Sequence, residues 1–347
     1  MPKLSKSVIY LSILFALTIS TTSHAESAKQ SKAESFSNPN DVANIEDGFI
    51  EKKIKYDEKI GKDVDVVISL GQQTYPAIHE IVEQIAKEKG IKIEIQEGTC
   101  GATAKKLLSK TVDIGTYCCP PGKVDRLPGL KFNTVAIAPV ALFTHLENPI
   151  DDVSTAEAIN IFKGEYVTWS EVPGYQSVSD KLKGEERIQP VVRLHCKKRP
   201  GHWRLLLDGP DNISPRAKSV GTIVDMIAQV SNDAAAIGYE TPFMLQVHSK
   251  KGEFKTLKID GIQPEDLTKL LTGAYPVYRT YNLTTWTNEN NRNEKAEIMM
   301  DAIYSYMQIH GEEHGFLPAK KLKLAGWKFK DKELIAEPDG KGVISEH

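Results

Sequence analysis

The chain has 347 residues and a formal net charge of −2, with 40% hydrophobic and 26% charged residues. These values are typical of a globular protein large enough for two lobes. Because the charge is nearly balanced, nothing in the composition indicates nucleic acid or an anionic membrane surface as a partner.

The N-terminus has the pattern of an export signal. Lys3 and Lys6 precede an apolar run over residues 8–19, and small residues surround a cleavage point after Ala25. This pattern predicts a secretory signal peptide over residues 1–25. The apolar run is shorter than a typical transmembrane helix, so we expect a soluble, periplasmic or otherwise exported protein. Residues 26–61 are expected to form a disordered lead-in.

Strands and helices alternate in the next part of the chain. A strand over residues 64–68 precedes a helical apolar period over Tyr75–Lys89, and a strand over residues 91–95 precedes a helix that includes residues 104–108. Residues 111–115 complete the series as a third strand. This alternation predicts an α/β fold with a mostly parallel, doubly wound sheet.

The second half of the chain predicts a second lobe and a strand that crosses back to the first lobe. Residues 132–144 form a long apolar run interrupted by Pro139, which suits a strand that crosses between lobes. The remaining expected elements are helices over residues 155–162, 222–230, 264–271 and 295–308, strands over 188–194 and 234–239, and a charged tail over 326–347. The strand over 234–239 is expected to cross back.

Three of the four cysteines lie between Gly98 and Gly122. Cys100 follows the second strand at the start of a helix, and Cys118 and Cys119 follow the third strand. Loops at the carboxyl ends of parallel strands meet at one edge of a sheet, where ligands bind. A helix N-terminus there also favours an anion. The sequence therefore predicts a ligand site at these loops.

Several short motifs together resemble one family, in the family's order along the chain. The chain resembles the phosphate-binding branch of the type II periplasmic solute-binding proteins, which serve ABC importers or signalling partners. The matching segments are residues 69–74, Gly98-Thr99-Cys100-Gly101, Asp113-Ile114-Gly115, residues 161–164 and 169–172, Arg193, Ala236-Ile237-Gly238-Tyr239 and residues 273–279.

The resemblance implies two α/β lobes joined by two crossover strands. Lobe I would comprise residues 62–138 and 240–325, and lobe II residues 139–239. It also implies a small inorganic ligand such as phosphate in the interlobe cleft, an ABC permease or membrane sensor as partner, and a monomer. The expected ligand-binding residues are Gly71, Gln72, Gln73, Thr74, Thr99, Cys100, Gly101, Thr116, Cys118, Cys119, Arg193 and Cys196. Arg193 would pair with the oxyanion.

The cysteines are where this chain departs from the family. Thiols replace hydroxyls in three loops, which weakens oxyanion binding and creates a candidate site for a thiophilic metal or a metalloid such as arsenite. The candidate ligands are Cys100, Cys118, Cys119, Cys196, His195 and His202. Disulfides are the other interpretation for an exported protein, and a bridge and a ligand site are compatible. A thiol redox protein that uses Cys118 and Cys119 is a further alternative.

Catalytic signatures are missing from the sequence. It contains no Gly-x-Ser-x-Gly, His-Glu-x-x-His or Cys-x-x-Cys pattern. We therefore predict a binding protein with no catalytic residues and no cofactor. Asp113 is expected to have a structural role.

Overall fold

The computed structural model describes residues 36–175, 187–194 and 212–338. The predicted signal peptide, and the candidate ligands His195, Cys196 and His202, lie outside these residues. The helices are α2 (Tyr75–Lys89), α3 (Cys100–Leu108), α4 (Thr155–Lys163), α6 (Ile223–Ser231), α7 (Pro242–Val247), α8 (Leu267–Leu271), α9 (Glu294–His310) and α10 (Ala319–Leu324). The strands are β1 (Val66–Gly71), β2 (Ile93–Gly98), β3 (Ile114–Tyr117), β4 (Leu130–Pro139), β5 (Ala141–Thr144), β6 (Asp152–Val153), β7 (Gln189–Val192), β8 (Lys218–Ser219), β9 (Ala236–Glu240), β10 (Lys255–Thr256), β11 (Lys258–Ile259), β12 (Tyr278–Trp286), β13 (Leu317–Pro318), β14 (Lys328–Lys330) and β15 (Glu333–Ala336).

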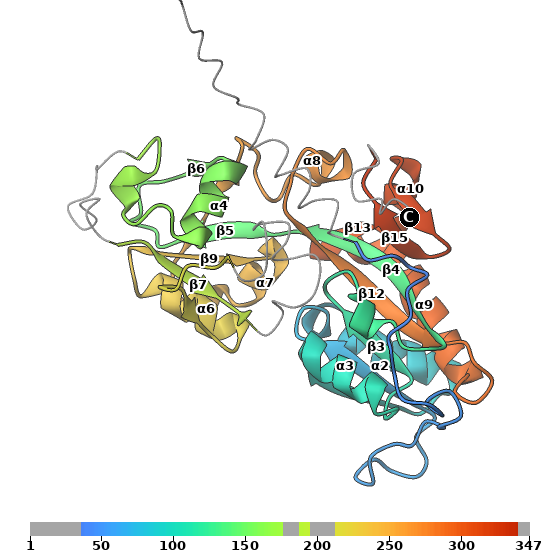
Figure 1. The fold of residues 1–347 in the computed structure, drawn as a ribbon. Helices are drawn as coiled ribbons and strands as arrows, with labels where there is room; N and C mark the ends of the chain where they lie inside the picture. Colours follow the sequence, from blue (N-terminus) through green and yellow to red (C-terminus); the bar gives the residue numbers. More distant parts are fainter. Residues whose placement is uncertain (1–35, 176–186, 195–211, 339–347) are drawn as a thin grey trace, which may run out of the picture.

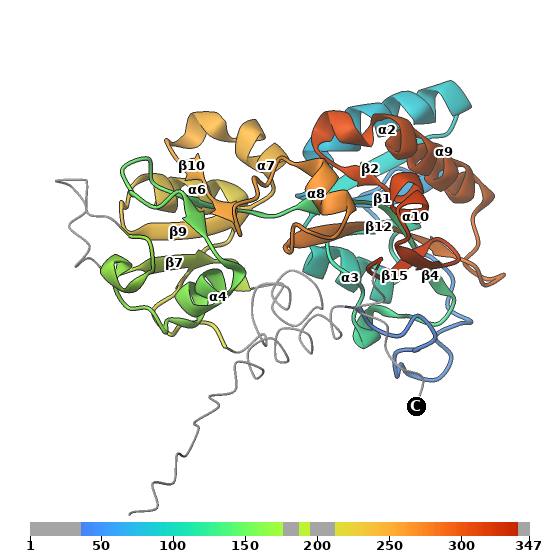
Figure 2. The same cartoon turned by 90° about the horizontal axis from the view of Figure 1, so that it is seen from above.

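Two sheets form two lobes that lie side by side in both views (Figures 1 and 2). One sheet has six strands in the order β13-β4-β12-β3-β1-β2, and the other has five in the order β10-β5-β9-β7-β8. Helices α2, α3 and α9 pack on the first sheet, and α6 packs on the second. One cluster of buried apolar side chains lies in the first lobe, and the other fills the second lobe and extends to Ile137, Tyr278 and Leu317 of the first sheet. The α/β fold predicted from the sequence is confirmed.

The chain passes from the first sheet to the second through Val140, which joins β4 directly to β5. It returns along β12, whose first residue pairs with the last residue of β4. The two connections contact each other, because Val140 N donates a hydrogen bond to Val277 O at 3.0 Å and Tyr275 Oη donates to Val140 O at 2.8 Å. Pro139 therefore ends a crossing strand, as its position in the apolar run predicts.

Local sequence signals explain where several elements begin and end. Helix α4 starts with a capping box in which Ser154 Oγ accepts from Glu157 N and the Glu157 carboxylate accepts from Ser154 N. It ends at Gly164 in the left-handed conformation that glycine favours. Gly115 lets α3 pack tightly on β3, since an added Cβ would lie 2.7 Å from Leu107 Cδ1 and from Thr103 Cγ2.

The sheets are more mixed than the expected parallel arrangement. Strands β1, β2 and β3 are parallel, whereas β12 runs antiparallel to both β3 and β4. Alternation of strands and helices predicts parallel pairing only where a helix connects neighbouring strands. Strands β4 and β12 are instead the strands through which the chain leaves and re-enters the first sheet, so the elements of the second lobe, and not a single crossover helix, connect them.

The segment after β9 lies with the second lobe. Strand β10 pairs with β5, and β11 pairs with β6. The sequence assigned residues 240–325 to lobe I and placed the return crossing before residue 240. We propose on this pairing that lobe II continues through β11 and that the chain returns between β11 and β12.

Parts of the expected lead-in and tail pack against the fold. Phe36 and Phe49 are buried, and Arg126 donates to the side-chain and backbone oxygens of Ser37 at 2.9 and 3.1 Å. At the other end, β14 and β15 form a hairpin attached to β4, because Leu334 N donates to Thr134 Oγ1 at 2.9 Å. Burial of apolar side chains explains why these segments are ordered despite their polar composition.

Within the described part of the chain, no helix combines the length and apolar character needed to cross a membrane.

Replacing Thr284 by valine tests how β12 is attached to β3. Thr284 Oγ1 is fully buried and accepts a hydrogen bond from Gly115 N at 2.8 Å. Valine keeps the shape but leaves that N–H without an acceptor, so Thr284→Val should lower the free energy of unfolding by about 1–3 kcal/mol. Urea unfolding measures the loss. The exposed Thr287→Val is the control and should change the same quantity by less than about 0.5 kcal/mol; equal values for the two variants would contradict the assignment.

Candidate functional site

The three expected ligand loops lie at one edge of the first sheet. Strands β1, β2 and β3 are parallel and end at Gly71, Gly98 and Tyr117, so the loops that follow them emerge together. Thr99 caps helix α3 by accepting from Ala102 N at 3.2 Å, and Cys100 and Gly101 form the first turn of that helix. The common edge predicted from the sequence is therefore present.

The polar groups of the first loop are used to hold the loops together. Gly71 N donates to Thr116 Oγ1 at 2.6 Å, and Gln72 N donates to Gly98 O at 2.8 Å. The N–H and hydroxyl of Thr74 both donate to Gly71 O, at 2.8 and 3.0 Å. We expected these groups to face a ligand. In this structure they bond to one another instead, because the strand ends approach closely enough for the loops to satisfy their own donors.

Charged side chains meet where the two lobes join. Arg193 follows β7, Glu240 ends β9, and Arg279 lies near the start of β12; we call these three residues the junction cluster. Glu240 Oε2 lies 2.7 Å from an Nη2 atom of Arg193, and Glu240 Oε1 lies 3.4 Å from Nη2 of Arg279. All three residues are buried, with exposed fractions of 5%, 0% and 1%. Glu240 therefore pairs with an arginine on each side.

Two further groups hold Glu240 in place. Gln73 Nε2, from the loop after β1, donates to Glu240 Oε1 at 2.8 Å, and Thr241 N donates to the same oxygen at 2.8 Å. Tyr281 Oη lies 3.4 Å from Gln73 Oε1. Gln73 is thus the residue of the first loop that reaches the junction cluster, and it links the first lobe to the end of β9.

The junction cluster has more positive than negative charge. Burial lowers the pKa of Arg279, but the nearby Glu240 carboxylate and Cys118 outweigh burial and raise it well above its ordinary value. The guanidinium group of Arg279 therefore remains charged, and the two arginines share a single carboxylate. Among the described residues, Nε of Arg193 and Nε of Arg279 are buried without a hydrogen-bond partner. Buried unpaired donors of this kind are costly, and an anion would satisfy them.

Two of the predicted cysteines come together beside the junction cluster. Cys100 Sγ and Cys118 Sγ lie 2.9 Å apart, which is longer than the disulfide bond length of about 2.05 Å. Cys118 Sγ also lies 3.8 Å from Nη1 of Arg279. Cys119 is buried as well, and its carbonyl accepts from Asn282 Nδ2 at 3.1 Å. Cys118 is thus the member of the adjacent pair whose thiol contacts both Cys100 and the arginine.

The described residues contain no group of three histidine, cysteine, aspartate or glutamate side chains placed to hold a metal ion. The expected metal site depended partly on His195, Cys196 and His202, which lie outside those residues. Cys100 and Cys118 supply two thiols of that set.

Sequence reasoning did not assign a ligand role to Glu240 or Arg279. Glu240 directly follows Tyr239, and Arg279 is the last residue of the segment 273–279, so both lie in or beside motifs that carry the family resemblance. The sequence signal that could have identified them is a charged residue within or directly after an apolar strand. Such charges are rarely buried unless they are paired.

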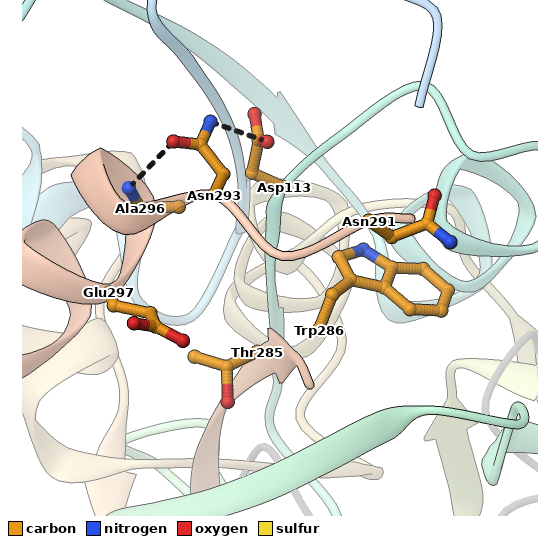
Figure 3. A pocket seen from close by; sticks show the side chains of 7 residues that line it. All are labelled: Asp113, Thr285, Trp286, Asn291, Asn293, Ala296 and Glu297. Atoms are coloured by element: carbon orange, nitrogen blue, oxygen red, sulfur yellow. Dashed lines mark hydrogen bonds between the residues drawn. The ribbon is translucent and has the colours of Figure 1, made fainter. Parts of the chain in front are cut away.

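Asp113 lies at the opposite edge of the same strands, just before β3. Its carboxylate accepts from Val67 N at 2.8 Å, from Tyr56 Oη at 2.7 Å and from Asn293 Nδ2 at 3.0 Å. Figure 3 shows Asn293 turned toward Asp113 at a small pocket beside the start of α9. Burial raises the pKa of Asp113 despite these donors. The contacts agree with the structural role expected for Asp113.

The sequence comparisons give a partial match. No family model matches the chain. The phosphate-binding protein PstS 2 of Streptococcus agalactiae, in each of two strains, is 25% identical over 108 residues, which are 31% of this chain and 37% of that protein. The matched part thus spans about a third of the length of these relatives.

Comparison with solved structures establishes the fold. A protein with bound phosphate from Clostridium perfringens, assigned as a phosphate ABC transporter substrate-binding protein, has a TM-score of 0.60 and 18% identity over 73% of this chain and 98% of its own. An ABC-type phosphate transport receptor from Vibrio cholerae has a TM-score of 0.57 and 15% identity over 73% and 99%. The resemblance found in the sequence is thereby confirmed for the fold: this chain has the two-lobed type II architecture of periplasmic binding proteins.

The variant Asp113→Asn tests whether the two edges of the first sheet have separate roles. An asparagine would direct its NH₂ group toward one of the three donors that Asp113 now accepts from, so the free energy of unfolding should fall by about 1–3 kcal/mol. Because Asp113 lies at the edge away from the junction cluster, the affinity for any anion held by that cluster, measured by calorimetry with inorganic phosphate below the melting temperature, should not change. A large loss of affinity in a folded variant would contradict this separation.

Proposed function

We propose that this chain is the solute-binding protein of an ABC importer or of a membrane sensor and that it captures a small oxyanion of the phosphate type between its lobes. The observation that carries the proposal is the junction cluster, in which Arg193 and Arg279 are buried against one carboxylate and each retains an unpaired Nε donor. The type II fold and the phosphate-related names of the similar proteins support the same ligand class.

The chemistry of the cluster suits a tetrahedral oxyanion. A guanidinium group offers a planar set of donors that matches two oxygens of one anion. Arg193 is positioned for this role, because Arg193 N donates to Tyr239 Oη at 2.8 Å and this bond fixes the backbone at the end of β7. Arg193 follows a strand of the second lobe, and Arg279 is the second residue of the strand that returns to the first. An anion held by both would bind the lobes together.

Export and the identity of the membrane partner belong to this proposal. The sequence of residues 1–25 has the pattern of a signal peptide, and proteins with this fold include transport receptors. In this account the protein binds its ligand outside the cytoplasm and delivers it without changing it chemically.

Replacing Arg193 by methionine tests the oxyanion site. Methionine keeps most of the apolar stem and removes the charged donors. Since a hydrogen bond to a charged group contributes about 1.5–3 kcal/mol, Arg193→Met should weaken phosphate binding by about 10- to 100-fold in isothermal titration calorimetry.

The matched control is Arg126→Met, another buried arginine that pairs with one glutamate, Glu333 at 2.6 Å, outside the junction cluster. It should destabilise the fold and leave phosphate affinity unchanged. If wild-type affinity for phosphate persists in Arg193→Met, the oxyanion site is not at this arginine.

The contact between Cys100 and Cys118 favours a thiophilic ligand as the second candidate. Two thiolates that share a tetrahedral zinc ion at about 2.3 Å from each sulfur lie roughly 3.8 Å apart. The observed 2.9 Å would have to open by a little under 1 Å, which rotation about the side-chain bonds can supply. Arg279 beside Cys118 stabilises a thiolate, the form that binds soft metals and metalloids.

Substitution of single cysteines by serine distinguishes this candidate. If Cys100 and Cys118 are the ligands, Cys100→Ser and Cys118→Ser should each weaken arsenite binding by at least about 10-fold, because one of the coordinating sulfurs is lost. Cys119→Ser is the control and should bind arsenite like the wild-type chain. Equal arsenite affinity in all four proteins would remove the thiolate site, and phosphate titrations of the same variants would show whether the oxyanion site is intact.

A further inference from the structure

Glu240 has an unusual arrangement of partners. Its two carboxylate oxygens go to different arginines, Oε2 to Arg193 and Oε1 to Arg279. A second buried pair, Arg126 and Glu333, is an ordinary two-bond pair, with Nη1 and Nη2 of one arginine at 3.1 and 2.6 Å from the two oxygens of one glutamate. Glu240 instead bridges two guanidinium groups that come from different strands.

A carboxylate in this position resembles an oxyanion ligand chemically. It presents two oxygens with a shared negative charge, and it accepts from the outer Nη atoms of the guanidinium groups. Those are the donors that an incoming tetrahedral anion would also use. While Glu240 holds one Nη atom of each arginine, the buried Nε atoms of both arginines have no hydrogen-bond partner among the described residues. Full use of both arginines by a ligand therefore requires Glu240 to give up at least one contact.

Glu240 also connects the arginines to the first lobe. Gln73 Nε2 donates to the same oxygen that faces Arg279, and Gln73 lies in the loop after β1. Movement of the Glu240 carboxylate would thus break a contact between the two lobes at the same time as it frees the arginines. The position of the Glu240 side chain therefore controls both the availability of the arginine donors and the contact with Gln73 of the first lobe.

We propose that Glu240 is a built-in competing anion, which occupies Arg193 and Arg279 and sets the affinity for the oxyanion ligand below what the two arginines alone would give. This inference rests on the proposed function, since it concerns the same site. Glu240 acts on the ligand through the arginines and is a positioning residue. Its charge also offsets one of the two guanidinium charges, so a dianion is bound less tightly than it would be without Glu240.

The variant Glu240→Gln tests the inference directly. Glutamine keeps the size of the side chain and removes the charge, so it holds the arginines weakly. Calorimetry with inorganic phosphate should show binding at least about 10-fold tighter than in the wild-type chain, because a competing charge-assisted pair is gone. Phosphate should also raise the melting temperature of this variant more than that of the wild-type chain, since the ligand replaces the lost counter-charge.

The variant Glu333→Gln is the matched control. It removes a buried carboxylate from Arg126 outside the cluster and should leave phosphate affinity at the wild-type value. If Glu240→Gln does not fold, Glu240→Asp serves in its place, because the shorter side chain keeps the charge but reaches the two arginines less well. It should bind phosphate more tightly than the wild-type chain.

The outcomes separate this inference from the proposed function. If the wild-type chain binds phosphate, Arg193→Met loses it, and Glu240→Gln or Glu240→Asp binds it equally or more weakly, then the competing-anion role is wrong and the oxyanion site stands. If neither the wild-type chain nor the Glu240 variants bind phosphate, both the proposed function and this inference fail.

Discussion

Two guanidinium groups buried against a single carboxylate impose the constraint on which the candidate site depends. A charge taken out of water is stable only when it is paired and its donors are satisfied. Glu240 supplies a negative charge and a hydrogen-bond acceptor to both Arg193 and Arg279. Gln73 and Thr241 hold Glu240 in place by donating hydrogen bonds to its carboxylate. The remaining positive charge and the unpaired Nε atoms make an anion the ligand class that the surroundings favour.

The path of the chain creates this arrangement. Strands β4 and β12 pair along their length and bring the two connections between the lobes together at Val140 and Val277. Arg279 stands opposite Ala138 on β4, and Glu240 stands opposite Ala141 on β5. Both charged residues therefore flank the point where the chain crosses. Relative movement of the lobes would act on their contacts first, which suits a site that closes around a ligand.

The sequence predicted much of the fold, and it singled out some of the residues that the structure brings together at the candidate site. The helical apolar period located α2 over Tyr75–Lys89 as the structure has it, and Pro139 marked the crossing. Periodicity could not show that β10 pairs with β5 and β11 with β6, because these two-residue strands carry no recognisable pattern.

The site was harder to predict because it depends on partners far apart in the chain. Arg193 and Cys100 were identified by their positions in motifs, and Cys118 was identified only as one of an adjacent pair. Gln73 and Glu240 are 167 positions apart, and only the folded topology brings them to 2.8 Å. The loop donors near Gly71 were expected to face a ligand, but short-range geometry lets them bond to Thr116 and Gly98 instead.

The most direct test of the account is a crystal structure of the full mature chain grown with inorganic phosphate. The account predicts one tetrahedral anion between the lobes, within hydrogen-bond distance of both Arg193 and Arg279, with Glu240 displaced from at least one of them. Phosphate bound elsewhere, or no phosphate at these arginines at a saturating concentration, would contradict the central claim that the junction cluster is an oxyanion site.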